Sequence, residues 1–237
     1  MKVSADPVPL PALDQIARPS IADQVLEVLQ SRILTLELPP GAKLSEADVA
    51  SQLGVSRQPV RDAFWRLSKL GFLHIRPQRA TTVTLISGAD VLRAQFIRTA
   101  LESETCRTFC RVRSDDDLAA LDALLDRQQA AIDAGQREIF HALDDQFHRE
   151  ICARSGVGFV WDLIHESKAH MDRVRMLSLD ASSQKLAISE HREICAAVRA
   201  RDEDAAADAL RRHLSRIRNL ISVLKEQNHS WFTEDPA

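Results

Sequence analysis

The chain has 237 residues, which is enough for two modest domains that each bury an ordinary apolar core. Its formal net charge of −3 at pH 7 excludes a protein that is basic over its whole surface. No apolar run approaches the ~18 residues that a membrane helix needs, and no signal-peptide pattern is recognised. The four cysteines form no CxxC pair and no dense framework, so we expect buried, reduced thiols in a cytoplasmic protein.

Prolines are concentrated at the start of the chain. Four of the nine lie within residues 1–19, where apolar residues show little periodicity, so we expect a flexible N-terminal arm there. Ser20 can cap a helix that extends to about Leu36, and Pro39-Pro40-Gly41 turns the chain after it. The apolar positions of this helix are Ile21, Val25, Val28, Leu29 and Ile33.

A helix-turn-helix is predicted for residues 45–71. Ser45 can cap the first helix, and Asp48 follows three residues later, as in a capping box. Only two residues separate this helix from the next, which Ser56 can cap, so the two helices must cross sharply. The second helix carries an apolar stripe and ends at a glycine suited to left-handed backbone: Val60, Phe64, Leu67, Leu70 and Gly71.

The second helix also carries the residue types that read DNA. Arg57 and Gln58 lie in its first turn and Arg61 lies one turn later, on faces that the apolar stripe leaves free. In the major groove, Arg binds guanine and Gln binds adenine. Residues 57–79 hold six Lys/Arg and one acid, a net charge of +5, whereas residues 87–237 hold 21 Lys/Arg and 26 Asp/Glu, a net charge of −5. A solvated basic helix is the alternative for this stretch alone, but the uneven charge favours a DNA-binding domain joined to a domain with another role.

Two β-prone runs, Phe72–Ile75 and Thr81–Leu85, surround a basic turn. They predict a hairpin wing, and we expect Arg79 at its tip and Ser56 to contact DNA phosphates. Residues 20–85 resemble the winged helix of GntR-type bacterial transcription regulators through the run PPGAKLSEADVASQLGVSRQPVRDAFWRLSKLGFLHIRPQRATTV. Two positions depart from that family: Ala47 replaces a DNA-contacting arginine of some members, and Ala80 replaces the usual wing glycine.

The remainder of the chain is predicted to be helical. Six amphipathic segments cover about 89–113, 115–134, 136–154, 157–179, 183–200 and 203–228. We therefore expect a mainly α protein: a winged helix-turn-helix of three helices and a hairpin over residues 20–86, then an antiparallel bundle of about six helices over residues 88–228. Residues 229–237 form a C-terminal tail.

Four polar residues fall on the apolar faces of three bundle helices: Asp144, His148, His191 and His213. Asp144 and His148 are about 40° apart around their helix, so both can reach one point. A lone histidine on such a face is usually a core residue, but burying an unpaired carboxylate is costly. A divalent cation would satisfy all four groups, and this donor set suits Zn²⁺, Ni²⁺ or Mn²⁺ better than Ca²⁺. Spacing alone leaves the metal site and the hydrogen-bonded core equally open.

Residues 88–228 resemble the FCD effector domain of the FadR subfamily of GntR regulators. Metal-binding members carry Asp-x-x-x-His on one helix and single histidines on two later helices, and these four positions are filled here by the residues just named. The resemblance implies a divalent metal, zinc first, whose open positions accept the carboxylate of a small effector. Arg98, with Glu102 one turn later, matches an arginine that often faces the pocket, and Arg173 and Arg175 are further effector-binding candidates, with surface ion pairs as the alternative.

These features predict a transcription regulator, by resemblance a repressor and not an enzyme, that responds to a small carboxylic acid. A homodimer bound to an inverted-repeat operator is expected, because one short reading helix covers few base pairs. Two alternatives are a metal-dependent hydrolase with a nucleic-acid module and a pure metal sensor. The hydrolase lacks an HExxH motif, and Asp145, the nearest spare carboxylate, is expected to point away from the cluster.

Overall fold

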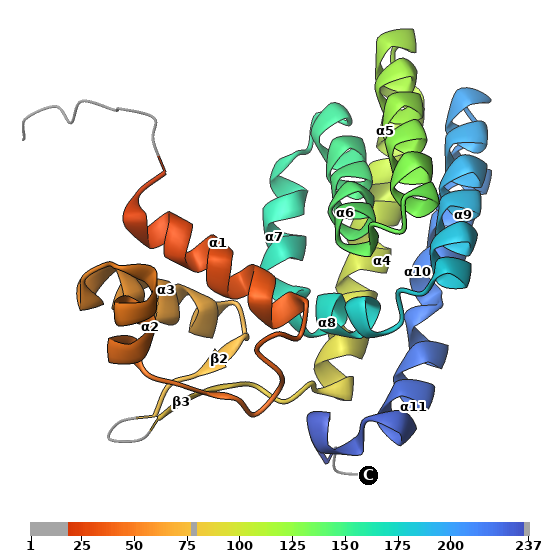
Figure 1. The fold of residues 1–237 in the computed structure, drawn as a ribbon. Coiled ribbons are helices and arrows are strands. Elements are labelled where there is room, and N and C mark those ends of the chain that lie inside the picture. The colour runs from red at the N-terminus through yellow and green to blue at the C-terminus, as the bar shows by residue number, and fades with distance from the viewer. Residues whose placement is uncertain (1–18, 77–79, 235–237) are drawn as a thin grey trace, which may run out of the picture.

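The computed structural model describes residues 19–76 and 80–234. Figure 1 shows a small N-terminal domain beside a larger helical bundle, with helix α8 between them. The expected arm, apart from Pro19, and Arg79 at the wing tip lie outside the described residues. None of the described helices is long and apolar enough to cross a membrane.

The N-terminal domain contains helices α1 (Ile21–Leu34), α2 (Glu46–Leu53) and α3 (Arg57–Lys69). Ser20 and Asp23 form a reciprocal capping box at the start of α1, and Ser45 caps α2 by accepting a hydrogen bond from the Asp48 amide. Ser56 occupies the N-cap position of α3 but makes no side-chain capping bond, so that part of the prediction is wrong.

A three-stranded antiparallel sheet completes this domain, in the order β1-β3-β2. Its strands are β1 (Lys43–Leu44), β2 (Leu73–His74) and β3 (Thr81–Val83). The wing hairpin is shorter than predicted, and the two-residue strand β1 was not expected, because it is too short for an alternating pattern. The buried core joins the three helices to the sheet through Val25, Leu29, Ile33, Val49, Val60, Phe64, Leu67, Phe72 and Val83.

The bundle contains α4 (Gly88–Val112), α5 (Asp115–Asp133), α6 (Arg137–Arg154), α7 (Phe159–Ser167), α8 (Ala169–Leu177), α9 (Ala181–Arg199), α10 (Glu203–Ser215) and α11 (Ile217–Gln227). A 3₁₀ turn, η1 (His229–Trp231), follows. The fourth and sixth predicted segments are each divided, at Lys168 and at Arg216. Neither break carries a proline or glycine, which is why the sequence does not predict it.

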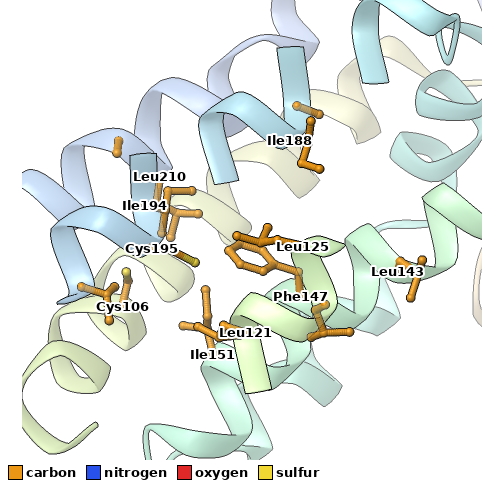
Figure 2. Close-up of a cluster of buried hydrophobic side chains, with 14 of the residues drawn as sticks. Cys106, Leu121, Leu125, Leu143, Phe147, Ile151, Ile188, Ile194, Cys195 and Leu210 are labelled. Atoms are coloured by element: carbon orange, nitrogen blue, oxygen red, sulfur yellow. The ribbon is translucent and has the colours of Figure 1, made fainter. Parts of the chain in front are cut away.

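The main core of the bundle lies where α4, α5, α6, α9 and α10 face one another (Figure 2). Phe147, Leu121, Leu125 and Ile194 are among its buried side chains. All four cysteines are buried and free, as the sequence predicts. This packing brings α6, α9 and α10 together, and these helices carry the four candidate metal ligands.

Candidate metal centre

The four predicted ligands meet inside the bundle. Asp144 and His148 come from α6, His191 from α9 and His213 from α10, and one ligand atom from each lies within 4.8 Å of the others. The side chains of Asp144, His148 and His191 are at most 1% exposed. Their periodicity placed them on the apolar faces, and the packing of three helices brings them to one point.

An oxygen atom lies beside the Nδ1 of each imidazole. His191 Nδ1 lies 2.9 Å from Gln128 Oε1, and His213 Nδ1 lies 2.8 Å from Glu190 Oε2. His148 Nδ1 lies 2.7 Å from Glu102 Oε2 in an ion-pair contact. These oxygens only accept hydrogen bonds, so the Nδ1 atoms of His191 and His213 carry the proton and their Nε2 atoms keep the lone pair. The contact of His148 with Glu102 is close but lacks the geometry of a hydrogen bond.

Gln128 fixes this arrangement further. Its amide nitrogen donates to the Leu143 carbonyl at 3.1 Å, which leaves the amide oxygen facing His191. A carboxylate or amide that orients the far nitrogen of a histidine is the usual support of a metal ligand. Sequence reasoning missed Gln128 and Glu190. The available signal was a glutamine within the apolar stripe of α5, where Leu121, Leu124, Leu125, Ala131 and Ile132 are also buried.

Two of the converging atoms lack partners of their own. The Nε2 atoms of His148 and His213 lie 3.2 Å apart and face each other. His191 Nε2 and Asp144 Oδ1 are buried, unpartnered and 3.6 Å apart. Two orphaned buried polar atoms are costly unless a cation lies beside them. Three imidazoles and one carboxylate therefore fit Zn²⁺, Ni²⁺ or Mn²⁺.

The ionisation of these residues also suits a metal ligand set. Burial lowers the pKa of His191 well below its ordinary value, and burial also lowers the pKa of His213. Burial acts to raise the pKa of the Asp144 carboxyl, but the Arg175 guanidinium overcomes this and holds that pKa well below its usual range. At neutral pH, His191 and His213 are therefore neutral and Asp144 is charged, which are the forms that bind metals.

A small cavity of about 60 Å³ adjoins the cluster. Its polar wall consists of Arg98, Asp144, Arg175, Ser178, Ser183, His213 and Arg216. Its apolar wall consists of Phe140, Met171, Leu179, Ala187, Leu214, Ile217 and Leu220. Three guanidinium groups beside a candidate cation site make this cavity suited to a small anion with an apolar part.

Arg98 is positioned as the sequence predicts. Its Nε donates to Glu102 Oε1 at 2.5 Å, and the side chains of both residues are at most 3% exposed. Burial acts to raise the pKa of Glu102, but Arg98 and His148 together lower it to about 2. One carboxylate therefore orients both an arginine of the cavity and a histidine of the cluster.

Arg175 and Arg173 face different parts of the molecule. Arg175 Nη2 donates to Asp144 Oδ2, and its Nη1 lies 3.7 Å from Asp145 Oδ1. Arg173 does not line the cavity, and the expectation that it does is wrong. Its Nη1 instead donates to the Thr84 carbonyl at 2.5 Å, at the edge of the N-terminal domain. Side chains two positions apart on a helix point about 200° away from each other, so α8 presents these arginines to opposite sides.

Asp145 stays outside the four-residue cluster, as expected. Its Oδ2 lies 2.7 Å from Lys168 Nζ, and Lys168 also donates to Asp172 at 2.6 Å. Lys168 is 2% exposed, so these contacts form a buried ion-pair network at the break between α7 and α8. Asp145 is therefore not available as a free base beside the cluster.

The predicted DNA-reading residues share one exposed end of α3. Ser56, Arg57, Gln58 and Arg61 are all exposed. Arg61 Nη2 lies 3.1 Å from Glu46 Oε2 on α2, an ion pair that sequence reasoning missed. Both members are on the surface, so the pair contributes little stability and can be exchanged for a DNA contact.

A winged helix with exposed long donors on its second short helix, joined to a bundle with a buried three-histidine cluster, defines a DNA-binding regulator with a ligand-sensing domain. Comparison with protein families identifies the family of regulators to which the chain belongs. Residues 21–83 match the model of bacterial regulatory proteins of the gntR family, and residues 94–216 match the FCD domain. The chain belongs to the GntR family of transcriptional regulators and carries an FCD effector domain. It is a regulator and not an enzyme.

Individual relatives agree with this assignment. The HTH-type transcriptional repressor RspR of Escherichia coli (strain K12) is 35% identical over 91% of this chain and 95% of its own length. An uncharacterised HTH-type regulator of Streptomyces ambofaciens is 34% identical over 88% of both chains. The structure of E. coli McbR/YncC superposes with a TM-score of 0.74 at 26% identity, covering 88% of this chain and 98% of that one.

Proposed function

We propose that this regulator is a cytoplasmic repressor whose affinity for its operator changes when a small carboxylic acid binds at a divalent-metal centre in the bundle. The observation that carries the proposal is the convergence of three imidazole Nε2 atoms and one carboxylate beside the arginines that line the cavity. Asp144, His148, His191 and His213 would hold the metal, with Zn²⁺ first and Ni²⁺ or Mn²⁺ as the alternatives. The name of the repressor RspR supports repression.

The chain itself supplies most of what an acid effector needs. Arg98 is fixed by Glu102 and Arg175 is fixed by Asp144, so both guanidinium groups are held at the cavity before any ligand arrives. Pre-positioned donors bind a carboxylate without paying for side-chain ordering. A bound divalent cation would add open coordination positions for a carboxylate oxygen. The apolar wall then favours acids with a short hydrocarbon part.

The winged helix would bind operator DNA as half of a dimer. Arg57, Gln58 and Arg61 are exposed at the N-terminal end of α3, where they can reach base edges, and Ser56 is placed to contact a phosphate. We also propose that Arg79, which lies outside the described residues, contacts a phosphate. Because one α3 covers few base pairs, we expect a homodimer and an inverted-repeat operator. Footprinting with sizing at micromolar protein tests this, and a monomer that protects one unsymmetrical site would contradict it.

The metal-dependent response can be tested directly. Untagged protein purified without chelator and reloaded with Zn²⁺, Ni²⁺ or Mn²⁺ should bind one ion per chain by elemental analysis. Operator affinity is then titrated against sugar acids, hydroxy acids, dicarboxylates and aromatic acids, with and without metal. His148→Ala should lose both the metal and the acid response, and His165→Ala, an exposed histidine of the same domain, should keep both.

Two outcomes would change the proposal. If wild-type protein binds none of the three metals stoichiometrically, the three histidines are hydrogen-bonded core residues and not metal ligands. If metal alone changes operator affinity and no acid adds to the change, the protein is a metal sensor without an organic effector.

A further inference from the structure

The segment between the two domains, residues 84–87, is held by hydrogen bonds from α8. The Thr84 carbonyl accepts from Arg173 Nη1 at 2.5 Å, and the Ser87 amide donates to His170 Nδ1 at 3.2 Å. Arg173 Nη2 also lies 2.8 Å from the same His170 nitrogen and 3.0 Å from Thr84 Oγ1. Arg173 is fully buried, and its guanidinium lies 5.9 Å from the ring centre of Phe72. Two adjacent side chains of α8 therefore fix both ends of this linker.

The C-terminal segment holds the same linker from another side. The Ile86 amide donates to the Trp231 carbonyl at 2.8 Å, and the Thr233 amide donates to the Ile86 carbonyl at 2.9 Å. Ile86 and Phe232 form a parallel bridge although 145 other residues separate them in the chain. Residues 231–233, expected to be part of a tail, are thus paired with the linker through a single β-bridge.

The side chain of Ile86 is fully buried in an apolar cluster that belongs to the bundle. The cluster includes Val91, Ala94, Met171, Val174, Ile217, Ile221, Leu224 and Phe232, from α4, α8, α11 and the C-terminal segment. Main-chain bonds on both sides and a buried side chain leave Ile86 little freedom to move unless α8 or α11 moves with it.

Both holding elements also reach the metal pocket. On α8, Arg175 pairs with the ligand Asp144 while Arg173 pairs with the linker from the opposite face. On the other side, α11 follows α10 at the break beside Arg216. Arg216 donates to Glu190, the carboxylate that also accepts from the ligand His213. Ile217 lines the cavity and belongs to the cluster around Ile86.

Elsewhere the domains are separated by open grooves. A cavity of about 320 Å³ lies between α1 and α6, and one of about 740 Å³ lies between α3 and α7. The N-terminal end of α8 contacts the N-terminal domain, and Ala169 is buried in the core of that domain. A small movement of α8 would therefore reach the winged helix through the linker and through the Ala169 contact, and Leu34 of α1 also packs against the bundle core.

We propose that Arg173, His170 and residues 231–233 form a two-sided clamp on the linker, and that this clamp carries the state of the metal pocket to the DNA-binding domain. The inference rests on the function proposed above and assigns its regulation to these residues. An element can transmit a signal only if its arrangement differs in free energy between the two states of the site. We expect the clamp to meet that condition because α8 carries the partner of Asp144 and the partner of Thr84 within three residues.

The clamp itself can be tested without metal. Calorimetry of the metal-free, full-length protein should show one cooperative transition, since the clamp couples the two cores. Arg173→Met combined with Thr233→Pro, which removes the amide that donates to Ile86, should separate it into two transitions. Thr233→Ala keeps that amide, and Arg192→Met removes an exposed arginine paired with Gln129 on the bundle. Both controls should keep one transition. A single transition in the double variant, or two in the wild type, would overturn the clamp.

Hydrogen exchange with Zn²⁺ alone as the probe tests the connection to the metal site. In the wild type, Zn²⁺ should slow exchange several-fold in α6 and α9 and also at the Ile86 and Ser87 amides. In Arg173→Met and in Thr233→Pro, the slowing in α6 and α9 should remain while that of the linker is lost. Protection of α6 and α9 without any effect on the linker in the wild type would refute the inference. If Zn²⁺ protects no helix, the proposed metal site fails, and the calorimetry alone decides whether the clamp exists.

Discussion

Arg175 donates a hydrogen bond to Asp144 Oδ2, so a candidate effector-binding residue is paired with a candidate metal ligand. Burial acts to lower the pKa of Arg175, but Asp144 raises it above its ordinary value, so the arginine stays charged. The carboxylate also faces His191 from its other oxygen, at 3.6 Å. A bound cation and Arg175 would therefore both interact with the Asp144 carboxylate, which links the metal site to the effector cavity.

Removing the charge of Asp144 should affect metal binding and stability together. Asp144→Asn deletes the only carboxylate of the four-residue cluster and leaves the Arg175 guanidinium buried without that partner. Breaking a buried ion pair on one side costs about 3–5 kcal/mol, so the free energy of unfolding should fall by roughly that amount. Zinc titration and urea unfolding measure the two effects. Asp208→Asn, an exposed pair member on α10, should change neither.

The acceptors behind the histidines should matter nearly as much as the ligands. Gln128→Leu removes the acceptor of His191 Nδ1, so that the ring loses its fixed tautomer. Loss of such a support lowers metal affinity about 10- to 100-fold. Competition with a chromophoric chelator measures this. Gln129→Leu, at a half-buried neighbour on the same helix that does not contact the cluster, should bind Zn²⁺ as the wild type does. Equal affinities for both variants would show that Gln128 does not support the site.

Operator recognition should depend on the exposed end of α3. Arg57→Ala or Arg61→Ala should cost about 1–3 kcal/mol at the operator if the arginine reads a base. Arg79→Ala should weaken all sequences alike and lower the salt slope by about one. Anisotropy titrations on specific and scrambled duplexes separate these cases, and Arg111→Ala, on the bundle, is the control. Unchanged operator affinity in both α3 variants would reject α3 as the reading helix.

His170 should make the domain junction sensitive to acid. Burial, and then the nearby charge of Arg173, lower the pKa of His170 to about 4, although Asp90 acts to raise it. An unfolded histidine titrates near 6.5, so between about pH 6.5 and 4 the unfolded chain binds a proton that the folded chain does not. The free energy of unfolding should therefore fall as the pH drops through this window, by up to about 3 kcal/mol from this group.

Urea unfolding from about pH 7 to about pH 4 measures this loss. His170→Gln keeps a hydrogen-bond acceptor but cannot be protonated, so its stability should depend less on pH across the same window. His165→Gln, at an exposed position, should follow the wild type. Identical pH dependence in all three proteins would assign the acid sensitivity to other groups.

The sequence by itself determined the winged helix, most of the bundle helices and the four residues of the cluster. These features are written in local signals: capping residues such as Ser20 and Ser45, apolar stripes at helical spacing, and the four-residue step from Asp144 to His148. The hydrophobic period of a helix determines which face each side chain occupies, and burial of that face brings Asp144 and His148 into the core.

Only the tertiary structure decided how those residues are used. Gln128 and Glu190 fix the histidine tautomers from other helices, Arg173 and Arg175 separate to opposite sides of α8, and Phe232 pairs with Ile86. The breaks at Lys168 and Arg216 also have no local marker. Each of these features depends on groups that meet only when distant helices pack, and no periodicity within one segment specifies which partner a buried polar group will find across the core.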